Sequence, residues 1–250
     1  MSLHAFELKG ADGKLIRGDR ADGTGRQIIF MTGFLSKRWG NKSKALAQWC
    51  EQQGWGFCCY DVRGFGDSEG TFTDYTLSDW MADARAVISM PKNKSGLTIV
   101  GNSLGGWIAW MMAQEFEQVD RLILIAPAFN MMGVRADSIS AERRHDWQSA
   151  GWMPWDDDPL HKDWPLSWKW VEESRHFWKS SFDRLRSVKT TILHGSHDSV
   201  ILPEGSRQFV AQLLAKAPGY PIDLNLISGD HRLSSPEYIQ LFHRLVLEPV

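Results

Sequence analysis

A serine stands between two glycines in the segment Gly101–Gly105, which reads GNSLG and fits the pattern G-x-S-x-G. In this pattern a serine sits on a sharp turn between a strand and a helix, so its hydroxyl projects above a sheet. The flanking positions must lack side chains, because neighbouring turns come close. An apolar run, Leu97 to Val100, enters the pattern and an amphipathic helical pattern leaves it. We therefore expect Ser103 to be a nucleophile.

A serine hydroxyl is a weak nucleophile until a base removes its proton, and the base needs a carboxylate partner. With this pattern the partners follow in the order serine, acid, histidine. Among eight histidines, His231 follows the last expected strand and Asp198 follows the strand before it, so both loops open at the carboxyl edge of the sheet. Asp230 could also orient the imidazole, but sequence neighbours seldom reach each other's side chains, and His197 fits a loop residue better than the base. The sequence predicts a triad of Ser103, Asp198 and His231, in which the carboxylate fixes the tautomer of the imidazole.

A tetrahedral oxyanion needs two preorganised backbone N–H donors. One donor is expected from Leu104, the residue after the nucleophile, and the other from the loop after the strand Gln27 to Thr32. In that loop Gly33 permits a turn that points the N–H of Phe34 at the site, unless Gly33 does no more than end the strand. We predict Phe34 and Leu104 as the oxyanion-hole donors, with the Phe34 side chain lining the acyl pocket.

Strand-like apolar runs alternate with helical patterns along the chain. The expected strands are His4 to Leu8 and Leu15 to Gly18 (a hairpin), Gln27 to Thr32, Gly56 to Tyr60, Leu97 to Val100, Arg121 to Ala126, Thr190 to Leu193 and Ile222 to Ile227. The expected helices are Ser43 to Gln53, Leu77 to Met90, Leu104 to Phe116, Pro203 to Ala215 and Pro236 to Leu247. This alternation predicts an α/β fold with a mostly parallel central sheet flanked by helices.

One segment, residues 129–186, interrupts the alternation and contains no clear strand. Seven of the thirteen tryptophans fall between Trp147 and Trp178, and three prolines break the segment into short pieces. We expect a single domain over residues 1–250 with a helical cap at about 129–186, whose tryptophans mostly form its own core. The residues expected at the substrate pocket are Phe34, Leu35, Trp152, Trp155 and Trp170.

Composition excludes several classes of function. The net charge of −2 gives no reason to expect a nucleic-acid partner, and the longest apolar stretches are too short to span a bilayer. Three cysteines, two of them adjacent, do not suggest a disulfide framework or zinc spacing, and no phosphate loop occurs. We expect no metal and no cofactor. The N-terminus does not read as a secretory signal, so we expect a cytoplasmic protein.

The segment Asp61–Gly70 resembles the D-x-R-G-x-G-x-S loop of the α/β-hydrolase superfamily. More narrowly, the segments 33–36, 101–107 and 230–233, and WVEESRH in the insertion, resemble the α/β-hydrolase-domain-10 type, which includes an acyl-glucuronide esterase, a palmitoyl-protein thioesterase and bacterial relatives. Thr32 departs from the histidine that many superfamily members carry before the glycine. The resemblance implies an α/β-hydrolase fold with a cap. The glycines of the loop allow tight turns, and Asp61 or Asp67 is expected to bind turn amides, so we expect the loop to have a scaffolding role.

The leading hypothesis is a serine hydrolase that cleaves carboxylic esters with a hydrophobic acyl or aryl group through an acyl-serine intermediate. A thioesterase acting on acyl-protein or acyl-CoA is the alternative, since both reactions run through the same acyl-enzyme. A peptidase is less favoured because the chain lacks room for a large second domain. A non-catalytic protein that binds a small hydrophobic ligand is the hypothesis from a different class, and loss of a triad residue would favour it.

Overall fold

A central sheet of eight strands organises the computed structural model, which describes residues 2–90, 96–155 and 164–247. The strands lie in the order β1-β2-β4-β3-β5-β6-β9-β10, and all neighbours from β4 to β10 are parallel. β1 and β2 form the expected antiparallel hairpin, and β2 pairs antiparallel with β4. The predicted α/β fold with a mostly parallel sheet is therefore confirmed.

The strands of the main sheet are β1 (His4–Lys9), β2 (Leu15–Ala21), β3 (Gln27–Met31), β4 (Gly56–Tyr60), β5 (Leu97–Asn102), β6 (Val119–Ile125), β9 (Lys189–Gly195) and β10 (Ile222–Ile227). The helices are α1 (Asn41–Gln53), α2 (Leu77–Ile88), α3 (Leu104–Glu115), α4 (Met131–Ser138), α5 (Ala141–Ala150), α6 (Trp168–Ser180), α7 (Pro203–Lys216) and α8 (Pro236–Leu247). Helix α1 begins two residues before the sequence prediction, because Ser43 caps it by accepting a hydrogen bond from the N–H of Gly40.

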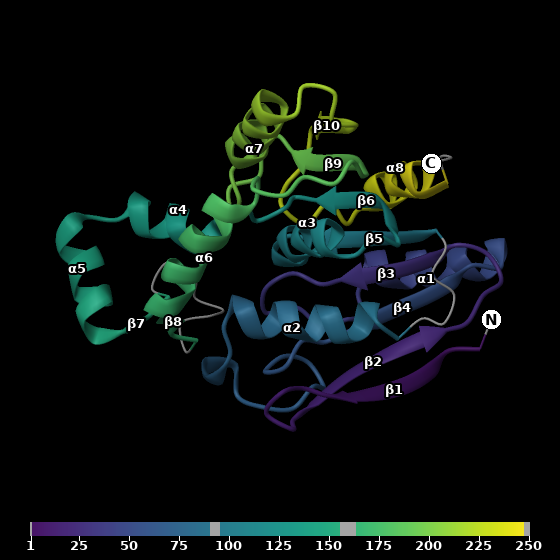
Figure 1. The fold of residues 1–250 in the computed structure, drawn as a ribbon, viewed down its shortest axis with the longest axis horizontal. Coiled ribbons are helices and arrows are strands. Elements are labelled where there is room, and N and C mark those ends of the chain that lie inside the picture. Colours follow the sequence, from purple (N-terminus) through teal and green to yellow (C-terminus); the bar gives the residue numbers. More distant parts are fainter. Residues whose placement is uncertain (1, 91–95, 156–163, 248–250) are drawn as a thin grey trace.

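Two hydrophobic clusters cover the two faces of the sheet, because successive side chains of each buried strand point to opposite sides. In β3, Ile29 and Met31 pack with α2, α3 and α7, whereas Ile28 and Phe30 pack with α1 and α8. Continuous apolar strands such as β3 are typical of parallel sheets buried on both faces. Because these strands are parallel, their carboxyl ends lie at the same edge of the sheet, at its left in Figure 1.

The inserted segment, residues 129–186, lies beyond that edge and carries α4, α5 and α6 (Figure 1). The sequence prediction that it holds no strand is wrong in one detail. The two-residue strands β7 (Trp152–Met153) and β8 (Leu166–Ser167) pair antiparallel. Trp147 stabilises this pairing, because its buried indole N–H donates a hydrogen bond to the carbonyl of Leu166 at 2.8 Å. A pairing this short has too little periodicity to be recognised in the sequence.

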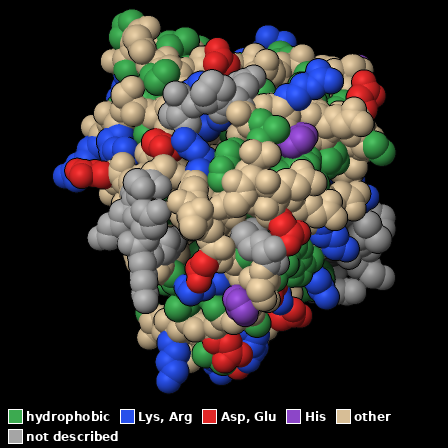
Figure 2. All heavy atoms as spheres, turned by 90° about the vertical axis from the view of Figure 1, so that its right-hand side faces the viewer, with side chains coloured by type: hydrophobic (Ala, Val, Ile, Leu, Met, Phe, Trp, Pro, Cys, Tyr) green, Lys and Arg blue, Asp and Glu red, His purple; other side chains and the backbone are tan. Residues whose placement is uncertain are grey.

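Acidic and basic side chains are interspersed on the face that Figure 2 shows, which is the end of the sheet opposite the inserted segment. This mixture agrees with the small net charge. Among the residues that the structure describes, no helix is both long and apolar enough to cross a bilayer.

Candidate active site

Ser103 occupies the turn between β5 and α3 with φ 53° and ψ −119°, a conformation that non-glycine residues rarely adopt. Its backbone N–H donates to the carbonyl of Ile125 at 2.8 Å, and its carbonyl accepts from the N–H of Ala128 at 3.0 Å. A Cβ atom on Gly105 would approach the carbonyl oxygens of Met31 and Thr32 to 2.4 Å. Glycine is therefore required there, and the strained turn is held by the end of β6 and by the loop that follows it.

His231 stands between Ser103 and Asp198. Its Nε2 lies 3.2 Å from Ser103 Oγ, and its Nδ1 lies 2.7 Å from Asp198 Oδ2. Because the carboxylate can only accept, Nδ1 carries the proton and Nε2 is left to face the serine hydroxyl. The structure thus brings together the three residues predicted from the sequence, each from a loop at the carboxyl edge of the sheet.

Asp198 is fully engaged. Its Oδ1 accepts the backbone N–H groups of Val200 and Ile201 at 2.9 and 2.8 Å, and its Oδ2 faces both His231 and His194. Burial alone would raise the pKa of this carboxyl, but the hydrogen bonds from His194, His231 and the Ile201 amide outweigh burial and hold the pKa well below its ordinary value. Asp198 is consequently a fixed negative charge beside the imidazole.

The sequence reasoning missed His194, which is completely buried at the end of β9. Its Nε2 lies 3.2 Å from Asp198 Oδ2 and 2.9 Å from the carbonyl oxygen of Ile201, and its Nδ1 lies 2.8 Å from Ser206 Oγ. Both neighbours of Nε2 are acceptors, so Nε2 carries a proton and donates. The only signal in the sequence was the position of His194 four residues before Asp198.

Phe34 lies in a tight turn after β3, in which the N–H of Ser36 donates to the carbonyl of Gly33 at 3.2 Å. Leu35, the third residue of this turn, has φ 55°, which is unusual for a bulky residue. A Cβ atom on Gly33 would lie 3.1 Å from Ser103 Cβ, so the turn packs closely against Ser103. Leu104 begins α3, and no partner for the N–H of Phe34 or of Leu104 occurs within the described ranges.

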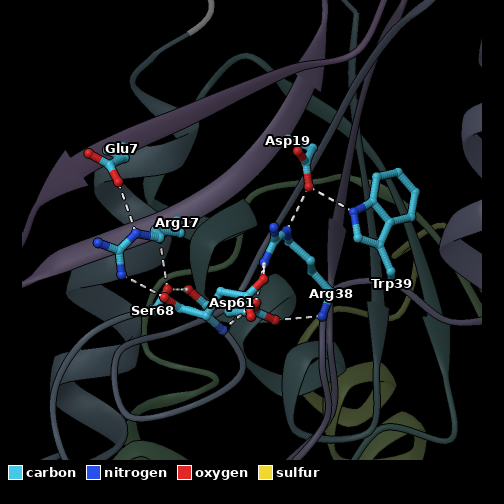
Figure 3. A network of polar contacts seen from close by, with 8 residues as sticks. Glu7, Arg17, Asp19, Arg38, Trp39, Asp61 and Ser68 are labelled. Atoms are coloured by element: carbon cyan, nitrogen blue, oxygen red, sulfur yellow. Dashed lines mark hydrogen bonds and ion pairs between the residues drawn. The ribbon is translucent and has the colours of Figure 1, made fainter.

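A cluster of charged groups anchors the far end of the same loop (Figure 3). The backbone N–H of Arg38 donates a hydrogen bond to Asp61 Oδ1 at 2.5 Å, and its Nη1 donates to Asp61 Oδ2 at 2.6 Å. Its Nε donates to Asp19 at 2.6 Å, and Trp39 donates to the same carboxylate at 2.7 Å. These contacts join the loop after β3 to β2 and to the loop after β4. Asp61 Oδ2 also accepts the backbone N–H of Asp67 at 3.1 Å, so this carboxylate binds both a turn amide and the arginine.

The loop that carries His231 is tied to α1. The Nζ of Lys42 donates to the carbonyl of Arg232, and Asp230 Oδ1 accepts the N–H groups of Arg232 and Leu233, both at 3.1 Å. Burial lowers the pKa of Lys42 to about 8, although Asp230 opposes that shift. Asp230 thus shapes the turn around His231, whereas the carboxylate that binds the His231 imidazole belongs to Asp198.

A small apolar pocket adjoins the site between the sheet helices and the inserted segment, with a cavity volume of about 10 Å³. Its lining residues are Phe34 from the loop after β3, Leu77 and Trp80 from α2, Leu104 and Trp107 from α3, Met131 and Met132 from α4, and Trp170 and Ser174 from α6. Phe34 and Trp170 were predicted for a substrate pocket, and their rings meet edge to face with centroids 5.5 Å apart.

The other residues predicted for the pocket lie around this pair. Trp155 packs against Phe34 with ring centroids 5.7 Å apart, and Leu35 packs against the same hydrophobic cluster. Trp152 is 40% exposed and contacts Trp170 from outside, with centroids 6.3 Å apart. None of these three lines the pocket in this conformation.

Hydrogen bonds fasten α6 of the inserted segment to the start of α2. The Trp170 indole N–H donates to the carbonyl of Tyr75 at 2.8 Å. Glu173 accepts from Thr76 Oγ1 at 2.9 Å, from Ser78 Oγ at 2.8 Å and from the Ser78 N–H at 2.9 Å. A carboxylate at a helix N-terminus is favoured electrostatically. The pocket is therefore closed over by a segment with specific polar contacts.

Other nucleophiles and metal sites find no support in the part of the chain that is described. All three cysteines are buried, and burial raises the pKa of Cys50 and of Cys58 to about 12, so these thiols are protonated near neutral pH. No group of three or more histidine, cysteine or acidic side chains in the described ranges is placed to hold a metal ion.

Comparison with known proteins gives consistent similarities. Residues 26–147 match the family described as serine aminopeptidase, S33. The chain is 26% identical over 219 residues to the palmitoyl-protein thioesterase ABHD10, mitochondrial, of Mus musculus, covering 86% of this chain and 71% of that protein.

Solved structures agree with this comparison. The mouse α/β-hydrolase domain-containing protein 10 superposes with a TM-score of 0.85 at 23% identity, covering 97% of this chain and 96% of that one. A hydrolase from Agrobacterium vitis superposes with a TM-score of 0.84 at 25% identity, covering 98% and 97%. On its fold, its arrangement of serine, histidine and aspartate and these similarities, the chain is a hydrolase with the α/β-hydrolase fold, similar to proteins of the ABHD10 type.

Proposed function

We propose that this hydrolase cleaves carboxylic esters with a hydrophobic acyl or aryl group through an acyl-enzyme on Ser103. The observation that carries the proposal is the continuous chain from Ser103 Oγ to His231 and on to Asp198, at 3.2 and 2.7 Å. An imidazole held in this tautomer by a buried carboxylate is a competent general base for a serine hydroxyl.

In the first half-reaction, Ser103 Oγ attacks the ester carbonyl while His231 Nε2 takes the hydroxyl proton. The tetrahedral oxyanion is stabilised by the N–H groups of Phe34 and Leu104, the two donors that flank the nucleophile. The imidazolium, stabilised by Asp198, then protonates the departing alkoxide, and the C–O bond to the alcohol breaks. Water repeats the sequence on the acyl-serine, which releases the carboxylic acid and restores the hydroxyl of Ser103.

The inserted segment is proposed to act as a cap, and the apolar pocket beneath it to take the acyl or aryl group. The pocket walls are aromatic and aliphatic, which suits a hydrophobic group. About 10 Å³ is too small for such a group, so side chains must move when it enters. Met131 and Met132 are suited to this, because methionine side chains are flexible and adapt to irregular shapes.

Thioester hydrolysis is the second candidate, and the comparison with relatives named as palmitoyl-protein thioesterases favours it. Both reactions use the same acyl-enzyme, so the leaving group distinguishes them. These relatives are also named as mitochondrial, and the cytoplasmic compartment stays a prediction for this chain.

The experiment is labelling with a fluorophosphonate probe followed by steady-state kinetics. We expect Ser103 to be labelled, and Ser103→Ala to abolish both labelling and turnover while the fold is retained by circular dichroism. A chain-length series of 4-nitrophenyl esters should peak at a medium-length acyl group. The N-acetylcysteamine thioester of the best acyl group then compares leaving groups. A folded wild-type protein that is not labelled would contradict the enzyme, and a strictly acetyl-limited profile would contradict the hydrophobic pocket.

A further inference from the structure

One polar group among the residues that line the apolar pocket has no hydrogen-bond partner in the described part of the chain. Three tryptophans line the pocket, and two of them satisfy their indole N–H groups with backbone carbonyls. Trp80 donates to Arg63 at 3.1 Å and Trp170 donates to Tyr75 at 2.8 Å. Trp107 is completely buried, and its N–H finds no hydrogen-bond partner among the described residues.

A second polar group joins Trp107 in the lining. Ser174, on α6, is 3% exposed and also lines the pocket. The two groups come from different layers of the molecule, Trp107 from the helix that follows the nucleophile and Ser174 from the inserted segment. Every other lining side chain is apolar or has its polar atom engaged elsewhere.

A buried donor without a partner is costly. Leaving it unsatisfied costs the full desolvation penalty of the group, and such groups are rare in native proteins. Phenylalanine would fill much of the same apolar space without this cost. If the donor lies in the wall of a ligand site, an acceptor on the ligand supplies the missing hydrogen bond. Binding of that ligand then removes the free-energy cost.

We infer that the indole N–H of Trp107, with Ser174 beside the same pocket, recognises a hydrogen-bond acceptor oxygen carried within the acyl group of the substrate. The inference rests on the proposed function and narrows its substrate class. The acyl group is then hydrophobic but contains a keto, ether or hydroxyl oxygen, rather than being a plain alkyl chain. A site with a buried donor rejects the analogue that lacks the acceptor more strongly than an apolar site distinguishes chain lengths.

The kinetic test compares 4-nitrophenyl hexanoate with its 4-oxo and 5-oxo analogues, each rate being normalised to that of hydroxide-catalysed hydrolysis. For one of the two keto esters, we expect the wild type to show a kcat/KM about 10-fold above that of the plain ester, equivalent to one hydrogen bond of ordinary strength. Trp107→Phe should reduce that ratio by about the same factor, and Ser174→Ala should reduce it partially.

Trp168 supplies a matched control. Its indole N–H is also buried without a partner among the described residues, but Trp168 does not line the pocket. Trp168→Phe should therefore leave the ratio of keto to plain ester unchanged. A reduction equal to that of Trp107→Phe would overturn the inference, as would a wild type that prefers the plain ester over both keto esters.

A binding measurement keeps the inference testable apart from turnover. In the nitrogen-15 spectrum of the wild type, the indole resonance of Trp107 is the one that Trp107→Phe removes. Addition of the 4-oxo or 5-oxo hexanoate anion should shift this resonance downfield, and plain hexanoate should not. Equal shifts with keto and plain acids would overturn the inference even if Ser103 is an active nucleophile. Failure of Ser103 labelling would contradict the proposed function alone.

Discussion

His194 Nε2 lies 3.2 Å from Asp198 Oδ2, the same carboxylate oxygen that faces His231 Nδ1 at 2.7 Å. Two imidazoles therefore share one oxygen of the proposed acid, one of them fully buried and the other reaching the nucleophile. Each hydrogen bond to the charged carboxylate withdraws electron density from it, so a second donor makes Asp198 a weaker partner for the imidazolium of His231.

Replacing His194 should consequently move the pH profile. His194→Phe removes the donor and strengthens the attraction between Asp198 and protonated His231. Because the base must be neutral, the acidic limb of kcat/KM should shift to higher pH. His194→Gln keeps a donor and should partly restore the limb. A loss of activity without any shift of the limb would indicate that His194 only supports the packing.

The identity of the acid can be tested with two neighbouring aspartates. Asp198→Asn leaves the size of the side chain but loses the charge and favours the wrong tautomer of His231, so kcat should fall on the order of 10⁴-fold. Asp230→Asn is the matched control, because Asp230 is exposed and caps the turn that an asparagine can also cap. Steady-state kinetics on one ester compares the two, and a larger loss in Asp230→Asn would make Asp230 the acid.

Stability should depend on Asp198 at low pH. The pKa of Asp198 in the folded protein is below its value in the unfolded chain, so the carboxylate contributes stability above the unfolded value of about 4 and loses it as the pH falls further. Urea unfolding at pH values from 7 to 3 measures the free energy of unfolding of the wild type and of Asp198→Asn. The wild type should have the higher value at pH 7, and the difference should shrink as the pH falls. A difference between the two proteins that stays constant over this range would contradict the lowered pKa.

Arg38→Gln should lower the free energy of unfolding and should loosen the loop after β3 that carries Phe34. Asp61 is almost completely buried, and removal of its arginine leaves an uncompensated charge that costs about 3–5 kcal/mol of unfolding free energy. The control is Arg207→Gln, whose exposed contact with Glu204 at 3.8 Å is worth at most about 1 kcal/mol. Urea unfolding measures both, and equal effects of the two changes would show that the network in Figure 3 does not anchor the loop.

Lys42→Met should lower kcat/KM by about 10-fold, because the loop around His231 loses the donor that holds the carbonyl of Arg232. Lys44→Met, two residues along the same helix on an exposed position, is the control and should have wild-type kinetics. Comparable losses in the two variants would point to the net charge rather than to the position of the loop.

Several features of the site could be predicted because they depend on local chain geometry. The turn at Ser103 needs glycine where the backbone of β3 comes within reach, so its sequence pattern is short and specific. Strands and helices alternate along the chain, and the serine, the acid and the histidine follow successive strands. This order predicted that their loops lie together at the carboxyl edge of the sheet. By contrast, the pairing of β7 with β8 is too short to leave a periodic signal.

The turn at Ser103, the positions of Asp198 and His231 and the parallel sheet could be predicted from the sequence alone, since backbone geometry and apolar periodicity act over a few neighbouring residues. The packing of distant segments, by contrast, determines that His194 shares the oxygen of Asp198, that Arg38 reaches Asp61 across 23 residues, and that the N–H of Trp107 has no partner among the residues described. These contacts join segments far apart in the chain, and their donors and acceptors meet only after the helices and the inserted segment have packed against the sheet.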